Sequence, residues 1–174
     1  MLYASFCSAE GIYDSAFNRL AAYVTGGTFC HSQFIFEWNS TEVAKILTHK
    51  GFHKLRRESR ASREPAGESM YVCVDISWGG SVQFRILYSD ALDPYYGVPQ
   101  KNKVPIVCTF EQEVQLANWL QMQQGKSYDR IGALLCWVPW RGKRLECERY
   151  FCSQLMACGL EQVGILKFYN TGAM

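Results

Sequence analysis

The chain has 174 residues, of which 48% are hydrophobic and 14% aromatic, and its formal net charge is +2. This length and apolar content fit one domain with a sizeable core and exclude wholesale disorder. The near-neutral charge argues neither for nor against a nucleic-acid partner. No run approaches the roughly 20 apolar residues that are needed to span a bilayer.

The eight cysteines of the chain raise the question of disulfides. The first residues have neither the basic start nor the apolar run of a secretory signal. Several cysteines, such as Cys73, Cys108 and Cys136, lie in apolar runs, where a free thiol behaves as a small hydrophobe. No two cysteines are spaced as CxxC, so a structural zinc site is not predicted. We therefore expect reduced thiols in an intracellular, cytoplasmic compartment, a host cell or virion included, and neither metal nor cofactor.

The first half of the chain predicts a helix followed by a strand. Residues 11–25 have helical spacing, with Asp14 or Ser15 as the cap, and end at a glycine pair. Residues 31–38 alternate as a strand, and residues 40–50 continue as a helix. One face of that strand carries Ser32, Phe34, Phe36 and Trp38, and the other carries His31, Gln33, Ile35 and Glu37.

A basic stretch at residues 50–69 is interpreted as a loop insertion, and folding is expected not to require its residues 50–66. Its six cations are Lys50, Lys54, Arg56, Arg57, Arg60 and Arg63. A solvated loop at the rim of a cleft is the plainest interpretation. Contact of residues 50–63 with an anionic membrane or an acidic partner is the alternative, and a specific nucleic-acid partner is not expected.

The second half predicts two strands and then helices, which together favour an α+β fold in a single domain over residues 1–174. Residues 70–76 and 81–88 read as strands that a hairpin turn joins, and residues 94–105 read as loop, with a short apolar run at 104–108. The strongest helix is 110–124, from an N-cap at Thr109 to Gly125. Further helices are expected at 127–138 and at 148–159, the latter closed by Gly159, with a final strand at 163–169.

Two residues stand out as chemically useful. Cys152 lies in the expected first turn of a helix, where the helix dipole lowers a thiol pKa, so we expect it to be the most alkylation-prone thiol at mildly acidic pH. His31 lies at the head of a strand and could serve as its base. The alternative is that Cys152 is a buried core cysteine and that His31 has only a structural role. The base needs an orienting group, and Gln33, Asp75 or the more distant Glu37 could supply it.

Four segments in this order resemble the circularly permuted papain-like superfamily of the NlpC type. They are residues 29–35 with His31, residues 79–84 after a glycine pair, residues 125–129 with Tyr128 and Asp129, and residues 150–155 with Cys152. The resemblance extends to lecithin retinol acyltransferase, to the YiiX-like hydrolases and to members from large DNA viruses and phages. Gln154 and Gln33 stand where acidic residues are common in this superfamily.

The resemblance implies a small antiparallel sheet packed against helices and a cysteine hydrolase acting by acyl transfer. Cys152 would be the nucleophile, His31 the base, and Asp75 or Gln33 its orienting partner. Ser153, Trp78 and Tyr128 are the expected substrate-binding residues, and the substrate would be a peptide, amide or lipid ester. The alternatives are a catalytically idle binding or virion protein of the same fold, and a lipid acyltransferase or thioesterase.

Overall fold

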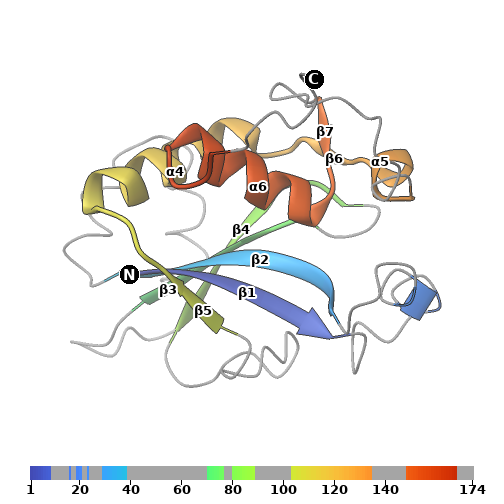
Figure 1. The fold of residues 1–174 in the computed structure, drawn as a ribbon, viewed down its shortest axis with the longest axis horizontal. Coiled ribbons are helices and arrows are strands. Elements are labelled where there is room, and N and C mark those ends of the chain that lie inside the picture. The colour runs from blue at the N-terminus through green and yellow to red at the C-terminus, as the bar shows by residue number, and fades with distance from the viewer. Residues whose placement is uncertain are drawn as a thin grey trace, which may run out of the picture.

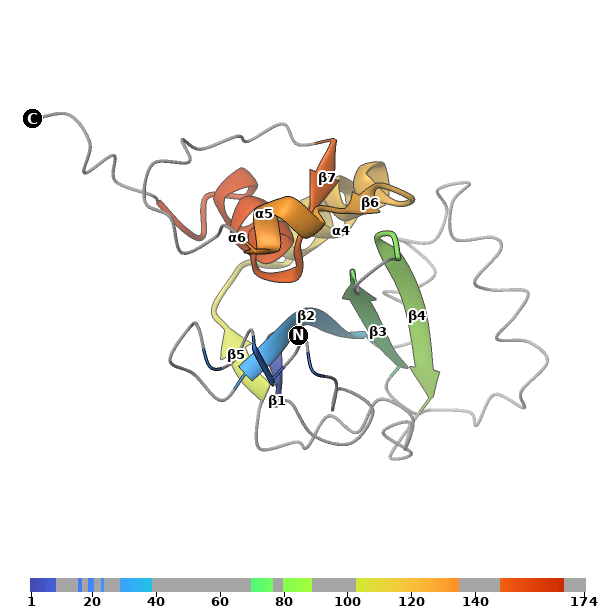
Figure 2. The ribbon, with the colours of Figure 1, turned by 90° about the vertical axis from the view of Figure 1, so that its right-hand side faces the viewer.

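The computed structural model describes residues 1–8, 16, 19–20, 23, 29–38, 70–76, 80–88, 103–134 and 148–167. In these segments the chain forms a five-stranded sheet with helices on one of its sides (Figures 1 and 2). All neighbouring strands of this sheet are antiparallel. The prediction of a mixed α+β chain with a small antiparallel sheet is therefore confirmed.

The sheet has the strand order β4-β3-β2-β1-β5. Its members are β1 (Leu2–Ser8), β2 (Phe29–Trp38), β3 (Met70–Asp75), β4 (Gln83–Tyr88) and β5 (Lys103–Ile106). The sequence predicted β2, β3 and β4 but not the other two strands. β5 was missed because it is short and contains a proline, which a sheet accepts at its edge.

Three helices with defined bounds follow the sheet in the described part of the chain. They are α4 (Phe110–Gln123), α5 (Arg130–Leu134) and α6 (Cys152–Gln162), and α5 is flanked by a small parallel pair, β6 (Ser127–Tyr128) and β7 (Arg149–Tyr150). The predicted helix at 110–124 is confirmed. Its cap is the expected Thr109, whose side chain accepts from the Gln112 backbone N–H, and Gln112 returns a side-chain bond to Thr109.

The two later helices differ from their predicted bounds. Helix 127–138 was predicted three residues too early, and helix 148–159 four residues too early, because their first residues pair with each other as β6 and β7. Gly159 does not close α6 but lies inside it. The helix ends after Gln162, and Gly164 adopts a positive φ of 73°.

The expected final strand at 163–169 is wrong over the residues that the structure describes there. Up to Lys167 the chain turns back on α6 instead of extending. The carbonyl of Leu160 accepts hydrogen bonds from the N–H groups of Ile165 and Leu166, at 2.9 and 3.1 Å. These bonds satisfy helix-end acceptors that would otherwise be open, so the apolar run serves as a C-terminal cap.

Several predictions fall outside the described residues. These are the helix at 40–50, the basic segment 50–69, Trp78 and the residues 135–138 of a predicted helix. The predicted helix at 11–25 lies outside them as well, apart from four isolated residues.

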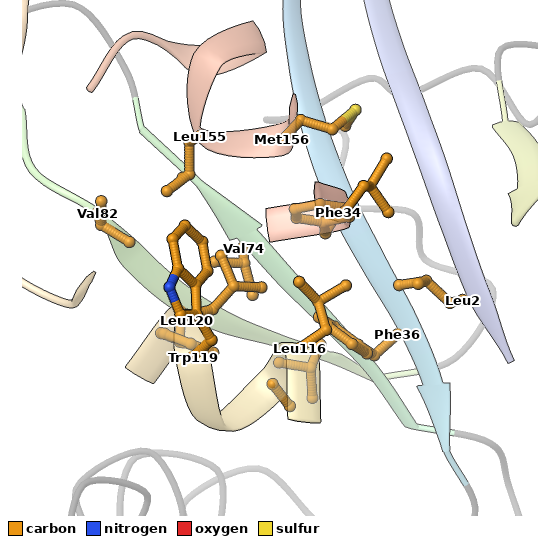
Figure 3. Close-up of a cluster of buried hydrophobic side chains, with 14 of the residues drawn as sticks. Leu2, Phe34, Phe36, Val74, Val82, Leu116, Trp119, Leu120, Leu155 and Met156 are labelled. Carbon is orange, nitrogen blue, oxygen red and sulfur yellow. The ribbon is translucent and has the colours of Figure 1, made fainter. Parts of the chain in front are cut away.

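The main core lies between the sheet and the helices α4 and α6 (Figure 3). Phe34 and Phe36 of β2 face Leu116 and Leu120 of α4, and Leu155 enters from α6. All five side chains are at most 2% exposed. Burial of each such side chain stabilises the folded chain by about 1.5–3 kcal/mol, so this layer fixes how α6 lies on the sheet.

The opposite face of the sheet is also buried in part but is far more polar. Its buried polar side chains include Ser5, His31, Gln33 and Asp75. Farther along the same face, Tyr3 and Tyr71 donate hydrogen bonds to Glu37, and the Lys103 ammonium lies over both tyrosine rings. Strand alternation separates this set from the apolar core residues.

Candidate active site

Cys152 is the first residue of α6, and the parallel pair β6–β7 fixes where that helix starts. The Asp129 N–H donates to the Tyr150 carbonyl at 2.7 Å, two residues before the cysteine. The buried Tyr150 hydroxyl donates to Gln123 Oε1 of α4 at 3.1 Å. The tyrosine–aspartate segment that the sequence singled out thus holds the residues leading into the cysteine helix.

Glycine at position 159 allows α6 to approach both α4 and β2 closely. A Cβ at Gly159 would lie 2.9 Å from Leu116 Cδ1 and 3.4 Å from Phe34 Cε2. A larger residue there would have to move the helix or these buried side chains. The middle of α6 is consequently held close to α4 and to Phe34 of β2.

Four polar groups favour the charged form of the Cys152 thiol. They are the backbone N–H and the hydroxyl of Ser32, and the backbone N–H groups of Ser153 and Cys152. The Ser32 Oγ atom is fully buried and makes no well-formed hydrogen bond. Burial raises the pKa of the thiol, and these donors lower it by less, so the pKa stays above its ordinary value. The expectation of a thiol with a lowered pKa is therefore wrong, because desolvation outweighs the helix N-terminus.

The direction of the Ser32 N–H shows where the sulfur lies. The Glu37 N–H donates to the carbonyl of Met1, just before β1, at 2.7 Å. Successive N–H groups of a strand point to opposite sides, so the N–H groups of the even-numbered residues of β2 point toward β3. The β2–β3 ladder ends at the pair Phe34 and Val74. The Ser32 N–H thus points sideways past the end of this ladder, and the sulfur that it contacts lies beside the edge of β2.

His31 precedes Ser32 on this stretch of β2. Its side chain is 7% exposed, and its Nε2 atom is fully buried. Alternation assigns the imidazole to the face with Gln33 and Ile35, whereas Ser32 shares the face of Phe34. The edge next to the sulfur is therefore bordered by Ser32 from the helix-covered face and by His31 from the opposite face.

The two candidate orienting residues share the face of His31. Gln33 is two positions farther along the strand, and its Oε1 accepts a hydrogen bond from the Cys73 thiol at 3.2 Å. Asp75 is at the end of β3, is 3% exposed and pairs in register with Gln83 of β4. The structure thus gathers His31, Gln33 and Asp75 on one face of adjacent strands.

The expected substrate-binding residues have different settings. Ser153 is exposed beside Cys152, and Tyr128 is partly buried in β6, where its N–H donates to the Gly80 carbonyl at 3.0 Å. The sequence did not single out Ser32 as a site residue. Two features of the sequence pointed to Ser32. It is next to His31 on the predicted strand, and it is a small polar residue on a face that is otherwise aromatic.

Within the described part of the chain, no three His, Cys, Asp or Glu side chains gather as a metal-binding group. Every described helix is too short or too polar to cross a lipid bilayer. No protein-family model matches this chain, nor does any curated protein or solved structure.

Proposed function

We propose that this chain is a cysteine hydrolase of permuted papain-like topology, acting by acyl transfer through a thioester at Cys152. The observation that carries the proposal is the contact between the sulfur at the start of α6 and the Ser32 N–H of β2. That N–H is one peptide unit from His31. A histidine strand that precedes a cysteine helix and lies against its first turn is the arrangement expected of that topology.

The buried thiol needs a general base in the proposed mechanism. Because its pKa is raised, the resting sulfur is protonated at neutral pH and must lose its proton as it attacks. His31 takes that proton while a bond forms between the sulfur and the carbonyl carbon. Collapse of the oxyanion breaks the bond to the leaving amine or alcohol, which receives the proton, and water then hydrolyses the thioester.

Asp75 or Gln33 orients the imidazole in this proposal. Both lie on its face of the sheet, and both are buried. A buried acceptor holds one ring nitrogen as a donor, which leaves the other nitrogen free to act as the base. The substrate class is an amide or ester whose carbonyl reaches the first turn of α6.

A second candidate function is a catalytically idle binding protein of the same topology. Two observations favour it: the raised pKa of Cys152, and the strand alternation that assigns His31 to the face opposite Ser32. In such a protein Cys152 would be a packing residue and His31 a buried structural histidine.

Acetylation by p-nitrophenyl acetate separates the two functions. We expect wild-type protein to release p-nitrophenolate in a burst and to carry one acetyl group on Cys152 by peptide mass spectrometry. Cys152→Ala should lack the burst, whereas Cys158→Ala, which removes another partly exposed thiol of the same helix, should keep it. Acetylation of Cys152 no faster than that of Cys158 would favour the idle protein.

A further inference from the structure

We propose that the Ser32 hydroxyl is a catalytic hydrogen-bond donor that binds the oxyanion formed during acylation of Cys152. This inference rests on the proposed hydrolase function. It assigns to a strand residue, beside the backbone N–H groups of the cysteine helix, the stabilisation of the charge that develops on the acyl oxygen.

The environment of the Ser32 side chain calls for an explanation. Ser32 is 6% exposed, its Oγ atom is fully buried, and it shares the face of β2 that carries Phe34 and Phe36. Among the described residues its hydroxyl makes no well-formed hydrogen bond, although it lies close enough to the Cys152 sulfur to favour a thiolate there. Burial of a hydroxyl against a weak acceptor such as a thiol costs free energy, so stability alone does not account for this serine.

The other donors converge on the same atom. The backbone N–H groups of Ser32, Cys152 and Ser153 all contact the sulfur, and α6 is 11 residues long, so its N-terminus adds a favourable dipole. A neutral thiol uses such donors poorly. An oxygen anion one carbon atom away from the sulfur would be a far stronger acceptor for donors that are gathered there.

The chemical step needs no further reagent besides the acyl donor. The sulfur attacks the carbonyl carbon, a C–S bond forms, and the carbonyl π pair moves onto oxygen as the thiol proton passes to His31. The Ser32 hydroxyl donates to this oxygen. The oxyanion then returns its pair to the carbonyl, the C–O bond to the leaving p-nitrophenolate breaks, and acetylated Cys152 remains.

Ser5 provides a matched comparison within the same sheet. It is 0% exposed, and its buried hydroxyl likewise meets no hydrogen-bond partner among the described residues. It pairs in register with Gln33, on the face that points away from α6. Ser5→Ala therefore makes the same chemical change at a site without a reacting atom.

The experiment compares two reactions of Cys152 in intact protein. Acetylation by p-nitrophenyl acetate passes through an oxyanion, whereas alkylation by iodoacetamide does not. We expect Ser32→Ala to lower the acetylation rate by about 100-fold relative to the alkylation rate, the lower end for loss of one oxyanion donor. Both rates are compared at equal thiolate fraction, taken from the pH dependence of alkylation.

The variants Ser32→Thr and Ser5→Ala should both keep the wild-type ratio of the two rates, the first because it retains a hydroxyl. If Ser32→Ala misfolds, as urea denaturation would reveal, Ser32→Gly, which also lacks the hydroxyl, serves as the second variant. A ratio unchanged in Ser32→Ala, with wild-type acetylation intact, would overturn only the role of Ser32. Absence of wild-type acetylation at Cys152 would overturn the hydrolase proposal and this inference with it.

Discussion

The two faces of the sheet differ in the kinds of side chains that are buried on them. The face under α4 and α6 is a continuous apolar layer, with Phe34 and Phe36 at its centre. The opposite face has a small apolar cluster around Ile35 and a set of buried or partly buried polar groups, from Asp75 to Glu37. Strand β2 contributes to both, so one ten-residue segment carries the core and the chemically useful residues together.

This difference explains why neighbouring residues can have unrelated roles. Ser32 belongs to the helix-covered face and contacts the sulfur, whereas His31 belongs to the polar face with Gln33. The two are adjacent in the chain but present their side chains to different faces. In the proposed hydrolase, a reactive centre at this part of β2 would draw on the rigidity of the apolar layer and on the titratable groups of the polar face.

The largest expected effect is loss of an aromatic side chain from the apolar layer. Phe34→Ala should lower the free energy of unfolding by about 3–5 kcal/mol, because it leaves a cavity between β2, α4 and α6. Ile35→Ala, the next residue on the polar face, should cost less, about 2 kcal/mol, since among the described residues its apolar neighbours are Tyr3 and Tyr71. Urea denaturation measures both, and equal losses would show that the two faces are equally well packed.

A smaller effect is expected from the polar contact that crosses the apolar layer. The Trp38 indole N–H donates to Glu113 Oε1 of α4 at 2.6 Å, and both side chains are buried. Glu113→Ala should cost about 1–3 kcal/mol in urea denaturation, because the indole donor loses its acceptor. Glu113→Gln keeps an acceptor oxygen and should cost less. A larger loss in Glu113→Gln than in Glu113→Ala would contradict this role.

The smallest effect concerns the polar face at high pH. Burial, the hydrogen bond to Glu37 and nearby negative charge raise the pKa of Tyr3 to about 12. The native state therefore keeps a proton that the unfolded state loses above about pH 10, so this part of the stability is present below pH 10 and falls away up to about pH 12.

Tyr3→Phe should cost about 0.5–1.5 kcal/mol at pH 7 and should show a shallower loss of stability between pH 10 and 12. Tyr23→Phe is the control, since Tyr23 is 84% exposed. The stability of the Tyr23→Phe variant should equal that of the wild type at every pH measured. Denaturation curves collected at several pH values measure this, and a steep alkaline loss retained in Tyr3→Phe would assign the effect to other groups.

The sequence predicted what depends on local pattern. Alternation identified β2 and the two faces of its side chains, and the cap at Thr109 identified the start of α4. It could not predict β6 and β7, because two-residue pairs arise from contacts between distant segments. It misjudged Gly159 because close packing against Leu116, rather than helix ending, explains the glycine.

The sequence singled out Cys152 and the histidine strand as a candidate site, but it did not reveal the electrostatics around the thiol. Cys152 lies at a helix start against the histidine strand, as the order of the segments suggested. The raised pKa of Cys152 was not predictable, because desolvation depends on how deeply the first turn of α6 sits against β2. For the same reason the proximity of Ser32 to the sulfur was not predictable, although its position next to His31 was visible in the sequence.

The most direct measurement is the pH dependence of Cys152 acetylation in wild type and in His31→Gln, with Cys152→Ala as the blank. We expect the wild-type reaction to include transfer of the thiol proton to His31, because neutral imidazole can accept that proton. His31→Gln should lose that step and react about 10²–10⁴-fold more slowly at pH 7.5. An identical rate and pH profile in His31→Gln, with the variant folded, would contradict a Cys152–His31 reaction centre.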